Sequence, residues 1–462
     1  MKKDDKNLRK ESDSMGELMV PKDALYKAQT QRAVNNFHVS GRVMPESFIK
    51  SLALIKRSAA EANMEIGLLN KKIGNAIVKS CKKIEDGCYM EHFPIDIFQT
   101  GSGTSTNMNM NEVLATLASS ESGMDVNPND HVNMGQSSND TIPTAIHVSA
   151  VLEIRQKLIP SLVHLKKTID KKAKLLNKHI KTGRTHLMDA MPIKMSQELN
   201  GWSLQIKKGI DRVSDCEKRL LMLSQGGTAV GTGINTDKKF TKIFLQKLKK
   251  SSGINFIPNE SFFEGISTQD GAVEMHGQLK TIAVSIMKIS NDLRLMNSGP
   301  LAGLGEIQLP ALQPGSSIMP GKVNPVIPES ACMVAARVIG NDSTITIAGQ
   351  SGNFQLNVML PLIADTLLDS ISLLSSISRL LADKAIDGFT VCEKNIKNSL
   401  SQNPILVTAL NPIIGYSKAA EIAKIAYSEG RPIIDVAEEK TDIPRKKLEF
   451  LLNPSKLTEG GM

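Results

Sequence analysis

The stretch from Leu279 to Met296 reads LKTIAVSIMKISNDLRLM, and it decides the fold class of this chain. Its apolar side chains recur in steps of three and four residues, at positions 279, 282, 286, 289, 293 and 296. This period predicts a long helix whose apolar seam packs against other helices. A second seam, with Ser370 as its only polar member, occupies positions 360, 363, 367, 370, 374, 377 and 381. A shorter stripe at positions 158, 162, 165 and 169 contains Pro160, which should bend that helix or perturb a turn.

The composition also favours helices packed on helices. Apolar residues make up 41% of the 462 residues and aromatic residues only 4%, and strand signals are sparse. A chain of this length exceeds the size at which a single core keeps growing. We therefore predict an all-α protein of two or three domains. Taken as three, they are residues 1–139, mostly helical with a polar tail; residues 140–364, a central helix bundle; and residues 365–462, a small helical domain.

The formal net charge of +9 leaves nucleic acid, a membrane surface or an acidic substrate open as partners. The lysines, however, stand as short scattered pairs, and only 4 Tyr and 1 Trp are present to stack on bases. A solvated surface is the favoured interpretation, so no nucleic-acid partner is expected. No apolar run reaches the roughly 18 residues that a membrane span needs, so no membrane is expected either.

The five cysteines stand at irregular spacing, without a Cys-x-x-Cys pair and without a histidine at metal-ligand spacing. This pattern indicates reduced thiols in a cytoplasmic protein that has no metal site. Residues 1–15 mix Lys, Arg, Asp and Glu without an apolar core. We expect them to form a polar, disordered tail rather than a targeting signal.

Between the two seams lies a loop of unusual composition, Gly315 to Asn324, which reads GSSIMPGKVN. Its glycines let a ligand approach the backbone closely, and Pro320 stiffens a turn. Lys322 offers a cation to a carboxylate, and Asn324 offers both a donor and an acceptor. The loop is therefore suited to holding a small anion. The alternative is a surface connection with ordinary turn residues, which the composition alone would favour.

Three other polar breaks interrupt the helical pattern, at Thr100–Asn111, Gly135–Asp140 and Thr182–His186. The first two are rich in hydroxyl and amide side chains, which are neutral donors that can orient a carboxylate. The alternative is that these residues only cap helices. The two interpretations are compatible, because a helix N-terminus also attracts anions.

The order of the residues in these breaks carries a resemblance. GSSIMPGKVN resembles the signature loop of the fumarase/aspartase superfamily, and the form with Gly321 before Lys322 looks like class II fumarase. QSSND at 136–140, GRTH at 183–186 and GGTAVGTG at 226–233 are similar to further motifs of that family, in the family's order. The resemblance extends from about Gly16 onward. It implies a three-domain homotetramer whose central helices form one shared bundle, with each active site built from loops of three subunits.

The resemblance also implies a reaction, the reversible anti-elimination of water from (S)-malate to give fumarate, a step of the tricarboxylic acid cycle. It implies no cofactor and no metal. Ser316 would be the base that removes the C3 proton, His186 would handle the proton of water or hydroxyl, and Glu329 would pair with that histidine. The residues implied to bind fumarate and L-malate are Ser102, Gly103, Thr104, Ser137, Ser138, Asn139, Thr185, Ser317, Lys322, Val323 and Asn324.

Each catalytic assignment has a plainer alternative. A lone histidine such as His186 is more often a satisfied core residue, and Glu329 suits the first turn of any helix. A free serine is far too weak an acid for the role given to Ser316 unless its alkoxide is stabilised. Backbone N–H groups and a cation can do this, and the glycine-rich loop with Lys322 is expected to supply both.

One departure from the family's pattern concerns a second anion site outside the active centre. Fumarases usually carry His-Pro-Asn-Asp there, whereas this chain has Asn127, Pro128, Asn129 and Asp130. Asn127 cannot carry a positive charge, so anion binding at this secondary site should be weaker.

Three other functions compete with a fumarase. An aspartate ammonia-lyase shares the fold and the chemistry, but Gly321 and the Ser137-Ser138 pair argue against it. A non-catalytic helical assembly protein would not need a full set of catalytic and binding residues, which here are Ser316, Lys322, Asn324, His186 and Glu329. A basic nucleic-acid-binding protein is indicated only by the net charge.

Overall fold

The structure is a computed structural model of the chain, and it describes residues 7–460. The chain divides into two compact units. The first comprises Met1–Ile159, Asp211–Thr281 and Arg337–Leu374, and the second comprises Pro160–Ile210, Ile282–Ala336 and Ser375–Met462. Each unit is described by itself. The division falls within long helices, and the three-domain boundaries expected from the sequence stay a prediction.

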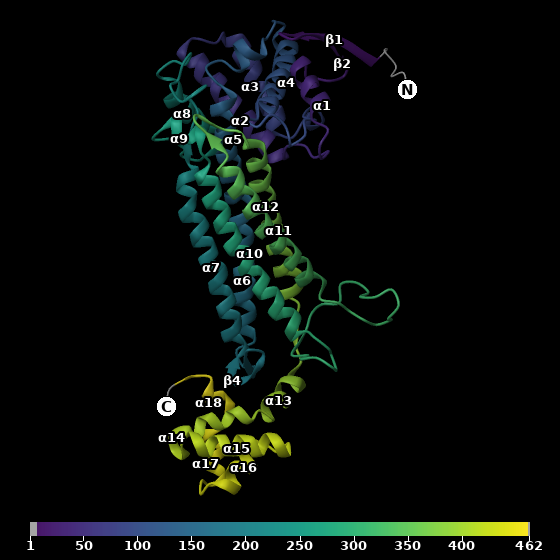
Figure 1. Cartoon of the computed structure of the whole chain (residues 1–462), viewed down its shortest axis with the longest axis vertical. Coiled ribbons are helices and arrows are strands. Elements are labelled where there is room, and N and C mark those ends of the chain that lie inside the picture. The colour runs from purple at the N-terminus through teal and green to yellow at the C-terminus, as the bar shows by residue number, and fades with distance from the viewer. Residues whose placement is uncertain (1–6, 461–462) are drawn as a thin grey trace. The chain divides into compact units, whose positions relative to one another are not determined.

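Long helices dominate the chain, as the seams predicted (Figure 1). Their bounds are Ile159–Leu175 for α6, Met195–Leu220 for α7, Asp270–Met296 for α10, Val326–Gly349 for α11 and Leu360–Leu381 for α12. Every seam residue of α10 and α12 is buried, as is the shorter stripe that leads into α6. The predicted all-α class is therefore confirmed. The expected effect of Pro160 is also observed, because the π-helical turn η4, Ile154–Leu158, directly precedes this proline.

The polar member of the second seam has partners inside unit 1. Ser370 is fully buried, and its hydroxyl lies 2.8 Å from Nε2 of His276 and 3.0 Å from Nδ2 of Asn341. Nδ1 of His276 lies 3.1 Å from the carboxylate of Asp342, which identifies Nδ1 as the donor and Nε2 as an acceptor for the serine hydroxyl. Burial lowers the pKa of His276. A polar cluster thus joins α10, α11 and α12 within this unit.

The remaining elements of unit 1 pack around α2, a helix that ends at Gly67, where a left-handed conformation is required. Phe48, Leu52 and Ile55 are fully buried, and α2 lies beside α3, α5 and α8 (Figure 1). The helices are α1 Ala28–Asn36, α2 Glu46–Ile66, α3 Lys71–Glu85, η2 Met90–His92, α4 Thr104–Ser122, η3 Pro128–Val132, α5 Ser138–Glu153, α8 Phe240–Ser252 and α9 Phe262–Ser267. The strands are β1 Leu8–Asp13, β2 Gly16–Pro21, β5 Met222–Leu223, β6 Ile257–Pro258, β8 Gly352–Asn353 and β9 Leu356–Asn357.

The N-terminal tail corrects one expectation. Residues 8–13 are not a disordered tail but the first strand of an antiparallel hairpin with β2. The guanidinium of Arg9 donates to the backbone carbonyls of Pro21, Ala24 and Tyr26 at 2.8, 2.6 and 2.6 Å. Charges that looked solvated in the sequence are in fact partnered by residues further along the chain, which composition cannot reveal. The expectation for residues 1–6 lies outside the described residues.

Unit 2 adds short elements to its parts of the long helices. The strands are β3 Ile180–Thr185, β4 Met188–Lys194, β7 Ile307–Gln308 and β10 Thr390–Val391. The helices are η5 Ala382–Ile386, α13 Glu393–Ser401, η6 Pro404–Leu410, α14 Asn411–Ile414, α15 Tyr416–Glu429, α16 Ile433–Lys440, α17 Arg445–Leu451 and α18 Pro454–Leu457. A local apolar core that includes Leu410, Ile422, Val436 and Leu448 holds the last helices together. In the described part of the chain the named strands form only two-stranded sheets.

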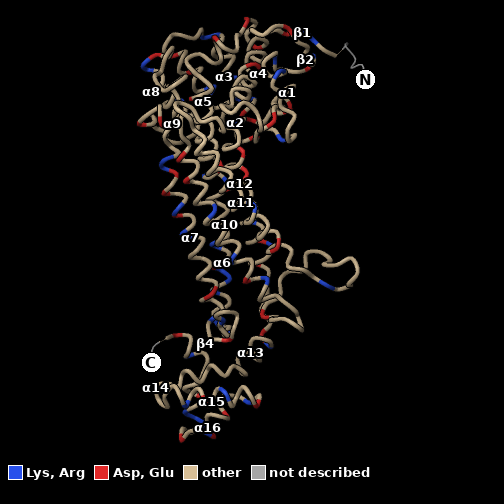
Figure 2. Tube along the Cα trace, in the orientation of Figure 1, with Lys and Arg blue, Asp and Glu red and all other residues tan. Residues whose placement is uncertain are grey.

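Three further features concern charge, cysteines and hydropathy. Lys and Arg are interspersed with Asp and Glu along the chain (Figure 2). All five cysteines are unpaired, and residues 7–460 contain no group of three or more His, Cys, Asp or Glu that could hold a metal ion. One helical segment, Leu360–Ile386, has the length and mean hydropathy of a membrane span, contrary to the prediction from the sequence. Because 72% of its most apolar window is buried in the protein, it resembles the core helix of a bundle.

Candidate active site

The Gly315–Asn324 loop in unit 2 is held closed by its own backbone. The N–H of Gly315 donates to the carbonyl of Lys322 at 2.7 Å, and Nδ2 of Asn324 donates to the carbonyl of Gly315 at 2.7 Å. A Cβ atom on Gly315 would lie 2.6 Å from the Lys322 oxygen, so only glycine fits this closure. The loop is therefore a defined structure rather than a loose connection.

Ser316 occupies a distinctive position at the start of this loop. Its Oγ accepts the backbone N–H of Ile318 at 3.2 Å and that of Met319 at 3.0 Å. Two N–H dipoles that converge on one oxygen stabilise negative charge on it. The side chain of Ser316 is half-buried, whereas Ser317, Lys322 and Val323 are exposed.

Glu329 follows the loop in the first turn of α11 and is partly buried. A carboxylate at this position is favoured by the helix dipole. Among the hydrogen bonds and ion pairs within residues 7–460, none joins Glu329 to His186, so the pairing of these residues stays a prediction.

His186 stands at the tip of the hairpin formed by β3 and β4. Thr185 pairs with Met188, which leaves His186 and Leu187 as a two-residue turn. Both turn residues have positive φ, 54° and 62°, a conformation that Asn and Gly adopt more readily. Thr185, His186 and Leu187 are all exposed. A strained, exposed histidine at a turn contradicts the satisfied core interpretation and is typical of a functional position.

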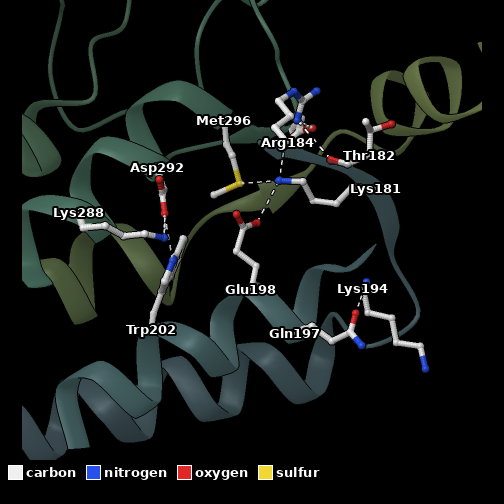
Figure 3. A network of polar contacts seen from close by, with 11 residues as sticks. Lys181, Thr182, Arg184, Lys194, Gln197, Glu198, Trp202, Lys288, Asp292 and Met296 are labelled. Carbon is white, nitrogen blue, oxygen red and sulfur yellow. Dashed lines mark hydrogen bonds and ion pairs between the residues drawn. The ribbon is translucent and has the colours of Figure 1, made fainter. Parts of the chain in front are cut away.

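A buried ionic network supports the base of this hairpin. Lys181 is almost fully buried, and its ammonium group contacts Glu198 at 3.0 Å and Glu306 at 2.6 Å. Arg184 contacts the other oxygen of Glu306 at 2.5 Å. Figure 3 shows Lys181 directed toward Glu198 and the sulfur of Met296. Two cations of β3 thus share one buried carboxylate, which fixes the strand that carries His186.

Replacing Glu306 by glutamine should lower the free energy of unfolding by about 2 kcal/mol, because two buried cations lose their shared negative partner. Urea unfolding followed by circular dichroism at fixed protein concentration measures this loss. Glu198→Gln is the matched control and should cost less than about 1 kcal/mol, since Glu198 is more exposed. Equal losses in the two variants would contradict the central place given to Glu306.

In unit 1, the segment before α4 forms a cap of neutral donors. The hydroxyls of Ser102 and Thr104 lie 2.7 Å apart, and Gly103 takes a left-handed conformation with φ of 72°. A Cβ on Gly103 would lie 3.0 Å from the side chain of Ile142 in α5. This close approach brings the N-terminal segment of α4 against α5.

Ser137 to Asn139 form the N-terminus of α5. Ser137 is the N-cap residue, and it completes a capping box with Asp140. The hydroxyl of Ser138 accepts Nδ2 of Asn107 from α4 at 3.0 Å, and Nδ2 of Asn139 donates to the carbonyl of Ala229 at 2.8 Å. The structure therefore brings the two predicted donor clusters of this unit together. Capping and anion binding remain compatible here, since two helices begin in the same region.

The proposed secondary anion site lies in the π-helical turn η3. Oδ1 of Asn127 accepts the backbone N–H groups of Asn129 and Asp130 at 2.8 and 3.0 Å. The N–H of Asn127 itself donates to Nδ1 of His131 at 2.9 Å, and Pro128 has no N–H to offer. The backbone N–H groups of Asn127, Asn129 and Asp130 are therefore already occupied by the chain.

One buried residue near these clusters was not found from the sequence. Lys56 lies on the buried face of α2, and its ammonium group donates to Asn133 at 2.9 Å and to Gln136 at 3.0 Å. The available signal was its place in a helical stripe between Leu52 and Ala59, where a lysine breaks the apolar pattern.

Comparison with known proteins agrees with this arrangement. The sequence matches the family described as Lyase over residues 16–340 and the family described as Fumarase C C-terminus over residues 406–459. It is 62% identical to "Fumarate hydratase class II 2" of Pseudomonas aeruginosa, covering 98% of this chain and 99% of the relative. It is 56% identical to "Fumarate hydratase class II" of Xylella fastidiosa, covering 98% and 96%.

Solved structures give the same result. The class II fumarase of Schistosoma mansoni superposes with a TM-score of 0.95 at 38% identity, covering 98% of this chain and 99% of that one. The fold and the motif loops define a lyase of this all-helical class. The chain belongs to the class II fumarate hydratase family, as the resemblance of its motifs predicted.

Proposed function

We propose that this chain catalyses the reversible interconversion of L-malate and fumarate by anti-elimination and addition of water. The observation that carries the proposal is the pair of backbone N–H groups, from Ile318 and Met319, on the hydroxyl oxygen of Ser316. A serine whose oxygen is held by two such donors can carry negative charge more readily than a free serine. This property is what the removal of a weakly acidic carbon-bound proton requires.

In the proposed mechanism, Ser316 takes the C3 proton of malate, and the electron pair moves into the adjacent carboxylate. The resulting charge is stabilised by Lys322 and by the amide of Asn324, with Ser317 and Val323 beside them in the same loop. The C2–O bond then breaks, and His186 protonates the departing hydroxyl to give water. Glu329 would pair with His186 and raise its basicity. The mechanism uses no cofactor and no metal.

The substrate carboxylates need further donors that do not compete for the proton. The hydroxyls of Ser102 and Thr104, and the N-terminal segment Ser137–Asn139 of α5, provide neutral donors of this kind in unit 1. Thr185 adds a hydroxyl beside the histidine in unit 2. Neutral donors near helix N-termini bind an anion without adding a titrating group.

We also propose the homotetramer, with each site assembled from loops of three subunits. Large apolar side chains are exposed in this part of unit 2: Leu301 at 97%, and Ile318 at 84% and Met319 at 48% within the Ser316 loop. Exposed apolar groups of this size favour burial against another copy. Sedimentation of a fully active monomer would contradict this assembly. The unpaired cysteines support a cytoplasmic location, and the occupied donors of η3 support weak anion binding at the secondary site.

The experiment that tests the function is ultraviolet absorbance of fumarate during incubation with L-malate, and in parallel with L-aspartate. We expect fumarate from L-malate and none from L-aspartate. Fumarate from L-aspartate would identify the leaving group as ammonia and the chain as an aspartate ammonia-lyase. No fumarate from either substrate would favour a non-catalytic helical assembly protein.

A further inference from the structure

Lys56 is a fully buried lysine with no role in the mechanism above. It lies on α2, and all of its neighbours described below belong to unit 1. Its ammonium group donates to Oδ1 of Asn133 and Oε1 of Gln136, both of them neutral amide oxygens. Lysine is almost never fully buried in a protein unless it is paired. Removing a charged ammonium group from water is unfavourable, so its surroundings must supply compensating hydrogen bonds.

The hydrogen bonds of Lys56 lead to a predicted substrate-binding residue. Oδ1 of Asn133 also accepts hydrogen bonds from two asparagines of α4. Nδ2 of Asn107 and Nδ2 of Asn111 each lie 3.2 Å from this oxygen. The same Nδ2 of Asn107 lies 3.0 Å from the hydroxyl of Ser138. One continuous network of buried polar groups therefore connects the lysine, α4 and the N-terminus of α5. Within the described residues the Oδ1 atoms of Asn107 and Asn111 are buried without a hydrogen-bond partner, so the network orients these amides through their Nδ2 donors alone.

Gln136 gives Lys56 a second route to the same loop. Its Oε1 accepts from the lysine, and its Nε2 donates to the carbonyls of Val132 and Met134 at 3.1 and 3.2 Å. The next residue, Ser137, is the N-cap of α5. The ammonium group thus binds two residues, Asn133 and Gln136, of the segment that immediately precedes the predicted donors Ser137–Asn139.

The opposite charge nearest to this network is the buried carboxylate of Asp140. It accepts the N–H groups of Ser137, Gly226 and Thr228 at 2.9, 3.0 and 2.9 Å. Burial raises the pKa of Asp140, and these N–H groups together with the charge of Lys56 oppose that rise. The carboxylate is therefore committed to the backbone, and within the described residues no hydrogen bond joins it to Lys56.

The charge of Lys56 is poised to change near neutral pH. Burial lowers the pKa of Lys56 to about 7, partly opposed by Asp140 of α5 and Cys81 of α3. Burial also raises the pKa of the Cys81 thiol, so that this neighbour stays neutral. Glu85, also on α3, pairs with Arg57 at 3.1 Å, and burial raises the pKa of Glu85 to about 7, partly opposed by Arg57. Because Glu85 is present in both the parent protein and Lys56→Arg, its titration does not distinguish them. From the 133–136 loop, Lys56 contacts the neutral amides of Asn133 and Gln136. The amides of α4 are linked to it only through Asn133.

We propose that Lys56 is a positioning residue for dicarboxylate binding. Through Asn133 and Gln136 it holds the Ser137–Asn139 segment in its binding conformation, and its positive charge favours the substrate anion bound there. It acts through these residues and does not touch the substrate. This inference rests on the proposed function, because it assigns Lys56 to the same dicarboxylate site.

The test is steady-state kinetics of the intact protein with L-malate. Lys56→Met, which keeps the length and removes the charge and the donors, should raise KM about tenfold while kcat changes less than threefold. Lys56→Arg should restore much of the loss, since it keeps the charge. Lys50→Met is the matched control, because Lys50 lies on the same helix in a surface pair with Glu46, and its KM should not change. A KM of Lys56→Met within twofold of the parent protein would overturn the proposal.

The pH dependence gives a second, independent measurement if the methionine variant fails to fold. In the parent protein, the affinity for L-malate should fall as pH rises from 6 to 9, because Lys56 loses its proton in that window. In Lys56→Arg this component should vanish, since arginine stays charged. An identical pH profile of KM in the two proteins would also overturn the proposal. A parent protein that produces no fumarate from L-malate at any pH would instead refute the proposed function.

Discussion

Replacing Ser316 by alanine should lower kcat for L-malate about 1,000-fold, within the range expected for loss of a general base. The reason lies in the two N–H groups from Ile318 and Met319 that converge on its hydroxyl oxygen. They stabilise an alkoxide that a free serine could not hold at neutral pH. Alanine removes the oxygen but leaves the backbone of the loop unchanged. KM should change little, because the carboxylate donors of the loop remain.

The control for this prediction is Ser317→Ala. Ser317 lies next in the chain and is exposed, but its hydroxyl makes no hydrogen bond within residues 7–460. We expect its kcat to fall less than about tenfold. Turnover is measured by fumarate absorbance, and loop integrity by the urea unfolding midpoint. Near-normal turnover of Ser316→Ala with an unchanged midpoint would refute its assignment as the base.

Much of the fold followed from local patterns. The seams of α10 and α12 repeat with a helical period, and a repeated apolar face must be buried somewhere, so their burial could be predicted without knowing their partners. The helix cap expected at Asp140 lies three residues earlier, at Ser137, and Asp140 instead completes the capping box. Gly315 was expected to allow close approach, and the structure specifies what approaches it: the carbonyl of Lys322.

What the sequence could not reveal depends on contacts between distant segments. The charges of Arg9 and Asp13 looked like those of a solvated tail, but Arg9 binds carbonyls near Tyr26, and Asp13 binds Arg32 at 2.8 Å. Lys56 was hidden for the same reason, since its partners Asn133 and Gln136 come from another part of the chain. Periodicity predicts which face of a helix is buried, but it does not predict which polar groups of other segments contact that face.

The predicted site loops of the two units are held in place by different kinds of contact. In unit 1 the start of α5 is held by the hydrogen bond that the N–H of Ser137 donates to the buried carboxylate of Asp140, and by the one that Lys56 donates to the preceding residue, Gln136. In unit 2 the Ser316 loop is closed by its own backbone, and the tip of the β3–β4 hairpin is strained. Strain at the position of His186 costs of order 1 kcal/mol, and a protein retains it only where it serves a purpose.

The second large effect that we predict is on turnover, and it concerns His186. Replacing it by asparagine should lower kcat about 100-fold, because the group that exchanges a proton with the leaving hydroxyl is lost. Asparagine adopts positive φ more readily than histidine, so the turn at φ 54° should be kept or slightly stabilised. Leu187→Asn is the matched control, since Leu187 has a φ of 62° in the same turn and carries no proton. Its kcat should stay within a few-fold of the parent protein.

Chemical rescue separates a proton-transfer role from a structural one. His186→Gly fits the same left-handed backbone without strain and opens the space of the ring. If His186 moves a proton, imidazole added to this variant should restore turnover in proportion to its concentration, whereas Leu187→Gly should not respond. Since the equilibrium between malate and fumarate belongs to the reaction, kcat/KM must fall by the same factor in both directions. Loss without rescue, together with a lowered unfolding midpoint, would mean that the histidine only shapes the turn.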